Sequence, residues 1–247
     1  MGKIEQACRF RLDSGYGIAA RSEGVVLEHE KAIGDAFNDS MNNLFPELGS
    51  SILSCTIRGR YVLYARNTLR TDIHGRKTIF THSYVMDQED YGQILCSCPQ
   101  QLLGVSMNRL MDSRGSDSEL PSLEPGDLNG EILDRDELFE KYGLNDPARY
   151  TLLLTGAYEA LSAGRSLRLY LNDMDISPEQ TVRELVFCMT EGLVKYLRRR
   201  INFSSGGDTR MSISILRGRE RSADSDMVYD VFDTKRMNIR VADKLKL

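Results

Sequence analysis

Residues 68–86 read TLRTDIHGRKTIFTHSYVM, and this stretch decides the expected fold. A glycine-containing turn around Gly75 is followed by apolar and polar positions that alternate from Lys77 to Met86, which predicts a β-hairpin. One face of the second strand would then carry Phe80, His82 and Tyr84. A histidine among aromatic residues in a strand is either a hydrogen-bonded core group or part of a functional site.

The sequence on either side of this hairpin extends it into an antiparallel sheet. Turn residues at 58–60 separate two further strand-like segments, so residues 52–86 are expected to form a meander. Apolar residues at helical spacing predict a helix over 28–43, and shorter helices are expected over 88–95 and 99–110. The full set of expected strands in this part is 8–12, 17–20, 52–58, 61–67 and 77–86.

A second module is expected after residues 112–130, a stretch rich in Ser, Gly, Pro and acidic residues that reads as a linker or long loop. Pro147–Ala163 has a helical apolar face, with Gly164 placed to end it. Ser177 and Pro178 begin another helix, which is expected to run to about Arg200. Strands are expected over 166–171, 211–216 and 227–232. The predicted fold class is α+β, with an antiparallel-sheet-rich module over 1–111 and a helix-plus-sheet module over 131–247.

The amino-acid composition and charge of the chain argue against several classes of protein. The chain has 247 residues, 41% hydrophobic and 28% charged, which is typical of a folded protein. Residues 1–146 hold 15 Lys and Arg against 23 Asp and Glu, and the remainder holds 17 against 13. Neither part has the basic excess of a nucleic-acid module, so no nucleic-acid partner is expected. The absence of a long apolar run or signal sequence favours a cytoplasmic protein without a membrane partner.

No catalytic or metal-binding motif occurs in the sequence. There is no Gly-x-Ser-x-Gly elbow and no phosphate-loop lysine, and Cys96 and Cys98 lack a second ligand pair at zinc spacing. No cofactor or metal is therefore expected, and His29 and His74 read as solvated. One enzymatic alternative stays open, a hydrolase or transferase in which His82 is the general base and Asp72 or Asp87 orients it.

A binding surface is the preferred interpretation of the hairpin. Aromatic, histidine and arginine side chains gather there, and such clusters mark recognition sites more often than isolated polar residues do. We expect the aromatic strand face to contact a protein partner, with two arginines at its edge. The candidate binding residues are Arg70, Arg76, Phe80, His82 and Tyr84.

The order of these segments resembles the GTPase-associated protein family of bacteria, its N-terminal module followed by its middle module. Similar motifs are spread over most of residues 4–95 and 150–205. In the first module they are residues 15–22 (GYGIAARS), Gly75 with Arg76, and residues 80–84 (FTHSY). In the second they are the leucine-rich helix 152–161, the strand 167–171, and residues 197–205 (LRRRINFSS).

The resemblance implies a role but supplies no catalytic residues. Proteins that look like this are thought to belong to bacterial gene clusters centred on a GTPase and to act in biological conflict. It therefore implies a cytoplasmic adaptor or regulator whose partner is a GTPase or its complex. Such proteins are usually longer, so the chain is expected to be part of a larger protein.

Overall fold

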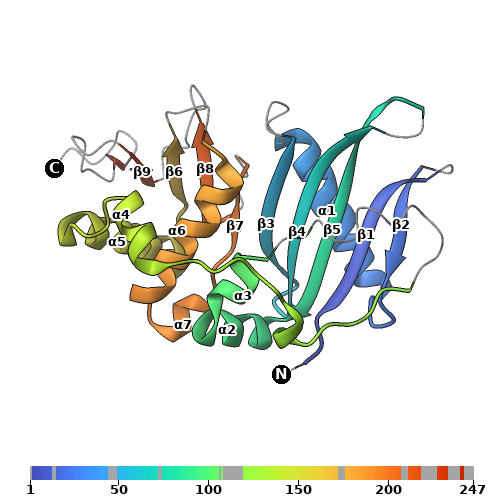
Figure 1. Ribbon diagram of the computed structural model, residues 1–247, viewed down its shortest axis with the longest axis horizontal. Coiled ribbons are helices and arrows are strands. Elements are labelled where there is room, and N and C mark those ends of the chain that lie inside the picture. The colour runs from blue at the N-terminus through green and yellow to red at the C-terminus, as the bar shows by residue number, and fades with distance from the viewer. Residues whose placement is uncertain are drawn as a thin grey trace.

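The computed structural model describes residues 2–12, 15–43, 49–71, 74–105, 107, 119–171, 176–206, 211–217, 227–232 and 240–241. Its strands form one ten-stranded sheet in the order β10-β9-β6-β8-β7-β3-β4-β5-β1-β2. Helices lie on both faces of this sheet (Figure 1). The fold is α+β, which confirms the predicted class.

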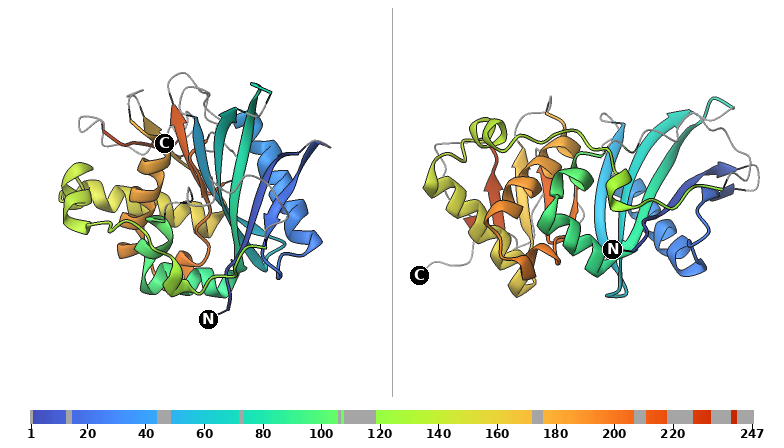
Figure 2. Two further views of the ribbon diagram at one scale, coloured as in Figure 1. Left: turned by 45° about the vertical axis from the view of Figure 1, so that its right-hand side comes forward. Right: turned by 60° about the horizontal axis from the view of Figure 1, so that its bottom comes forward.

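The N-terminal half of the sheet is antiparallel. Its elements are β1 (Glu5–Leu12), β2 (Gly15–Arg21), α1 (Leu27–Asn43), β3 (Ser50–Ile57), β4 (Tyr61–Thr71), β5 (Lys77–Asp87), α2 (Gln88–Ser97) and α3 (Pro99–Leu103). The predicted meander is confirmed, since β3 pairs with β4 and β4 with β5. Helix α1 packs on one face of this half, and α2 packs on the opposite face (Figure 2).

The C-terminal half brings parallel strands into the sheet. Its elements are α4 (Arg135–Lys141), α5 (Pro147–Ala163), β6 (Leu167–Leu171), α6 (Pro178–Gly192), α7 (Lys195–Arg198), β7 (Phe203–Ser204), β8 (Ile213–Arg217), β9 (Met227–Asp230) and β10 (Arg240–Val241). Strands β7, β8, β6 and β9 run parallel to one another, while β7 is antiparallel to β3 and β9 to β10. Helices α5 and α6 cover them on the same side of the sheet as α2 and α3 (Figure 2).

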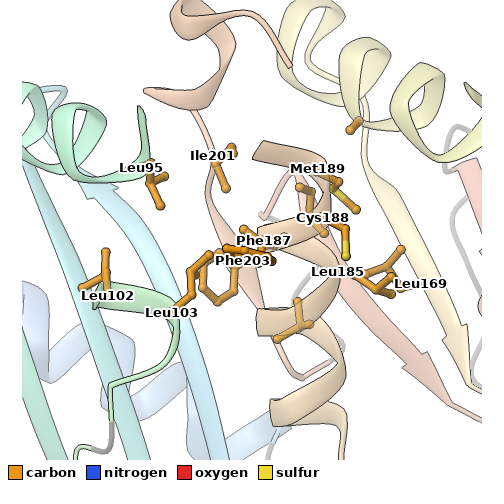
Figure 3. Close-up of a cluster of buried hydrophobic side chains, with 14 of the residues drawn as sticks. Leu95, Leu102, Leu103, Leu169, Leu185, Phe187, Cys188, Met189, Ile201 and Phe203 are labelled. Carbon is orange, nitrogen blue, oxygen red and sulfur yellow. The ribbon is translucent and has the colours of Figure 1, made fainter. Parts of the chain in front are cut away.

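One large core lies between this helical layer and the sheet. Leu169 of β6 faces Leu185 and Met189 of α6, while Leu102 and Leu103 of α3 approach the same core from the other side (Figure 3). All five side chains are fully buried. Because burial of each such side chain contributes roughly 1.5–3 kcal/mol, this layer is a main source of stability.

The sheet and its core run across both predicted modules. β3 of the first pairs with β7 of the second, at Leu53 with Ser204 and Ser54 with Phe203. Of the predicted linker, residues 112–118 lie outside the described residues, and the remainder contains a short 3-10 helix, η1 (Pro125–Asp127). The division into modules at 111 and 131 stays a prediction.

Three local expectations were wrong. The helix expected to reach Arg200 ends at Gly192, because Leu193 is extended (ψ 142°) and α7 begins afresh at Lys195. The helix expected over 99–110 ends at Leu103, and residues 108–110 lie outside the described residues. His29 is buried rather than solvated, with its ring 4.6 Å from that of Tyr61. Within the described residues, no helix is both long enough and apolar enough to cross a membrane.

Candidate functional site

The candidate strand face of β5 is divided between the interior and the surface. Phe80, His82 and Tyr84 share one face, as the alternation predicted. His82 and Tyr84 are only 2% and 5% exposed, whereas Phe80 is half-buried. The two buried rings meet edge to face with centroids 4.9 Å apart. The interior end of the face therefore offers nothing for a partner to contact.

His82 is enclosed by oxygen atoms of the fold. Its Nδ1 lies 2.9 Å from the Met107 carbonyl oxygen, and its Nε2 lies 3.2 Å from Oε1 of Gln6. Burial lowers the pKa of His82 from its ordinary 6.5 to about 4, although the hydrogen bond with Met107 acts in the opposite direction. The imidazole is therefore neutral at physiological pH.

The side-chain amide of Gln6 places a second hydrogen-bond acceptor next to the His82 ring. Nε2 of Gln6 donates to the Pro121 carbonyl oxygen at 2.7 Å, which directs Oε1 of Gln6 at His82. Both ring nitrogens thus face acceptors, but a neutral imidazole carries only one N–H. When Nδ1 carries the proton it donates to Met107, and Nε2 then faces Oε1 of Gln6 without a proton. Burial favours the neutral ring, and the two acceptors favour the charged one.

Gln6, which contacts His82, also donates a hydrogen bond to a segment that we call the strap, residues 119–123. The strap lies against β1 and β2, since Leu123 and Ile4 exchange two backbone hydrogen bonds of 2.8 and 2.9 Å. Leu120 N donates to Arg21 O at 2.9 Å. The Ser122 hydroxyl also donates to Glu5 at 2.9 Å. Gln6 therefore connects His82 to the contact between the strap and the sheet.

The surface end of the same face carries what we call the Phe80 patch, namely Phe10, Arg70 and Phe80. The Arg70 guanidinium lies 5.3 Å from the centroid of the Phe80 ring, a cation–π contact. The Phe10 ring lies 5.9 Å from that of Phe80. All three side chains are half-buried, so each presents part of its surface to solvent. Arg76 is exposed in the hairpin turn beside Gly75, whose φ is 76°.

The structure therefore unites only part of the predicted site. Arg70 and Phe80 contact each other, His82 and Tyr84 contact each other in the interior, and Arg76 is exposed in the turn. Sequence reasoning missed Phe10, which lies on β1. Its place beside Phe80 depends on the pairing of β1 with β5, and no local pattern in the sequence reveals that pairing.

A partly buried ion pair connects β4 to α6 next to this face. Arg66, which is opposite His82 in the β4–β5 register, lies with its Nε 2.9 Å from Oε1 of Glu179. The Ser50 hydroxyl donates to the same carboxylate at 2.8 Å. Because Glu179 belongs to the first turn of α6, the pair connects the antiparallel half of the sheet to the helical layer. We assign it a structural role.

Metal binding has no support among the described residues, which hold no group of three or more His, Cys, Asp or Glu placed to bind an ion. Comparison of the chain with protein-family models, curated proteins and solved structures finds no match in any of the three. The functional argument therefore rests on the residues themselves.

Proposed function

We propose that this chain is a non-catalytic adaptor that binds a protein partner through the Phe80 patch. The supporting observation is that Phe10, Arg70 and Phe80 form a half-buried cation–aromatic surface at the open end of a sheet face that is otherwise buried. Aromatic and arginine side chains of this kind are the residues that most often dominate binding energy at protein interfaces. The link to a bacterial GTPase rests on the sequence resemblance alone.

The charge around the patch favours an acidic partner. Arg11, Arg70, Arg76 and Lys77 lie at this end of β1, β4 and β5. The described residues of these strand ends and the hairpin turn, 9–12, 68–71 and 74–81, contain no carboxylate. Asp13 and Asp72 of the two turns lie outside the described residues, and even with both counted the cations are in excess. Opposite charge on a partner would speed association and select among partners.

The enzymatic alternative finds less support. A general base needs a ring nitrogen free to reach a substrate proton, but both nitrogens of His82 already contact oxygens of the fold. A base whose pKa is about 4 is also a weak proton acceptor near pH 7. Of the expected orienting carboxylates, Asp87 lies at the end of β5 and its Oδ1 is 3.9 Å from Nε of Arg60. Asp72 lies outside the described residues.

The proposal predicts that a GTPase is encoded near this gene, and that GTPase is the partner to test. Calorimetric titration of that GTPase with the wild-type chain should show binding, and Arg70→Glu and Phe80→Ala should each weaken it by about tenfold or more. Tyr158→Ala is the matched control, since Tyr158 is an exposed aromatic residue on α5, 53% exposed. Circular dichroism verifies the fold of each variant.

Two outcomes would contradict the proposal. If both patch variants bind as tightly as wild type, the patch is not the binding surface. If the wild-type chain does not bind the GTPase at all, the GTPase link is wrong.

A further inference from the structure

Strand β2 is the last strand at one end of the sheet and pairs on one side only, with β1. Cys8 pairs with Ala20 and Arg9 with Ile18, so Ala19 is an additional residue that forms a β-bulge. Within the described part of the chain, no strand pairs with the outer side of Ile18–Ala20. Unpaired backbone N–H and C=O groups on such an edge are a template for another extended chain.

The structure itself contains an example of such pairing. The strap approaches the C-terminal end of β2, where Glu119 and Arg21 form a parallel bridge and Leu120 donates its N–H to the Arg21 carbonyl. The end of this edge is therefore shaped to receive an extended segment. Further back along the strand, Ile18, Ala19 and Ala20 line a cavity.

A cavity of about 670 Å³ lies along this edge, lined by residues 18–23, Glu30 and Glu119. We call it the edge cavity. It is formed by β2, by the first turns of α1 and by the first residue of the strap.

The edge cavity is acidic. Glu23, Glu30 and Glu119 line it against the single cation Arg21, which forms an ion pair with Glu30. The remaining two carboxylates are on exposed residues. The lining therefore has a net charge of −2 and is complementary to lysine or arginine side chains.

We infer that the β2 edge binds an extended, basic segment of a partner protein by β-strand addition, with its Lys or Arg side chains facing Glu23 and Glu119. In this mode the backbone hydrogen bonds supply affinity, and the charges in the edge cavity supply preference for sequence. The site is separate from the Phe80 patch, which lies on the face of the sheet rather than on its edge. Variants of either surface leave the other intact.

The experiment uses a short synthetic peptide of alternating Lys and Val. Two further peptides serve as comparisons, one with Glu in place of Lys and one Lys-Val peptide with methylated backbone amides. Fluorescence anisotropy with the complete chain should show binding of the Lys-Val peptide and little binding of the other two. Backbone amides of residues 18–20 should become protected from hydrogen exchange when the Lys-Val peptide binds.

Paired charge variants test the role of the edge cavity. The double variant Glu23→Gln with Glu119→Gln should weaken Lys-Val binding by about four- to tenfold, as expected for two exposed charge pairs. The matched control is Glu131→Gln with Glu140→Gln, which changes net charge equally at exposed positions away from the cavity. Thermal unfolding of both double variants checks that each is folded.

Three outcomes would overturn the inference. The methylated peptide could bind as well as its parent, which would mean that charge alone holds it. The two double variants could weaken binding equally, which would place the effect in net charge. The chain could also associate with itself through an interface that Glu23→Lys with Glu119→Lys abolishes, as seen by sedimentation, and the occupant would then be a second copy.

Discussion

Protonation of His82 should destabilise the protein below about pH 6.5, and the dependence on pH can be calculated from its surroundings. The pKa of His82 is lowered by burial to about 4 in the folded chain, against an ordinary value of 6.5 that applies when the chain is unfolded. Between these two values the unfolded chain binds more protons than the folded chain, so the free energy of unfolding rises with pH. The stabilisation is fully present above pH 6.5 and is lost as the pH falls to about 4.

The size of this effect follows from the difference between the two pKa values. Each unit corresponds to about 1.4 kcal/mol, so protonation of His82 should lower the free energy of unfolding by about 3 kcal/mol between neutral pH and pH 4. The assay is urea unfolding at a series of pH values from neutral to mildly acidic, for wild type and for His82→Gln. A glutamine amide can still donate to the Met107 carbonyl but does not titrate. The difference between the two chains isolates His82 from His29, whose pKa burial also lowers.

The opposite dependence on pH would refute this reasoning. If the wild-type chain became more stable relative to His82→Gln as the pH fell, the imidazolium would be the preferred form in the folded state. The carbonyl of Met107 and Oε1 of Gln6, both within hydrogen-bond distance, would then outweigh the cost of burying the charge. A difference that did not change with pH would show that the environment of His82 is not the one described.

Three further changes test other contacts. Arg66→Ala and Glu179→Gln should each lower the free energy of unfolding by about 1–3 kcal/mol. Urea unfolding of both single variants and the double variant should show that the two losses are coupled. Additive losses would contradict the ion pair. Gly104→Ala should lower the free energy of unfolding by about 1–3 kcal/mol or more, because a Cβ there would lie 2.2 Å from the Glu131 carbonyl oxygen. An unchanged melting temperature in thermal unfolding would refute that close approach. Asp134→Ala should lower the free energy of unfolding by about 1 kcal/mol, because the Asp134 carboxylate caps α4 by accepting hydrogen bonds from two backbone N–H groups. Asp134→Asn should retain most of that capping and lose less.

The strands of the first half could be predicted because their signal is local. The alternation after Lys77 and the turn residues at 58–60 predict β5 to within one residue and the start of β4, which runs four residues beyond its expected end at 67. Each of these features concerns residues that are neighbours in the sequence. The pairing of β3 with β7 joins residues about 150 positions apart, and nothing in either segment specifies that partner.

The break in the predicted second helix shows how tertiary contacts override a local pattern. Apolar residues recur at helical spacing through Leu193, Val194 and Leu197, which predicted a single helix. In the fold, α6 ends at Gly192, where a Cβ would lie 2.4 Å from the side chain of Leu154 on α5. A side chain at this position would have to displace the ends of the Leu154 and Tyr150 side chains. The chain then turns so that Leu193 and Leu197 both remain buried.

The part of the candidate site that could not be predicted depends on distant partners. The pattern placed His82 on a face with Phe80 and Tyr84, but its contacts come from Gln6 and Met107, 76 and 25 positions away. Such partners decide whether a histidine is catalytic or structural. The sequence alone therefore leaves the alternatives open, because it does not reveal the contacts of the ring.

His82 and the edge cavity are connected through the strap. Gln6 contacts His82 with its carbonyl oxygen and Pro121 with its amide nitrogen, and Glu119, two residues before Pro121, contributes a carboxylate to the cavity. Contacts that fix Pro121 also restrict where Glu119 lies, because two residues of extended chain allow little freedom. A buried polar group costs free energy unless it is hydrogen-bonded, so a histidine in this core requires a reason. We propose that His82 positions Gln6, whose amide nitrogen in turn contacts Pro121 of the strap, and this role needs no proton transfer.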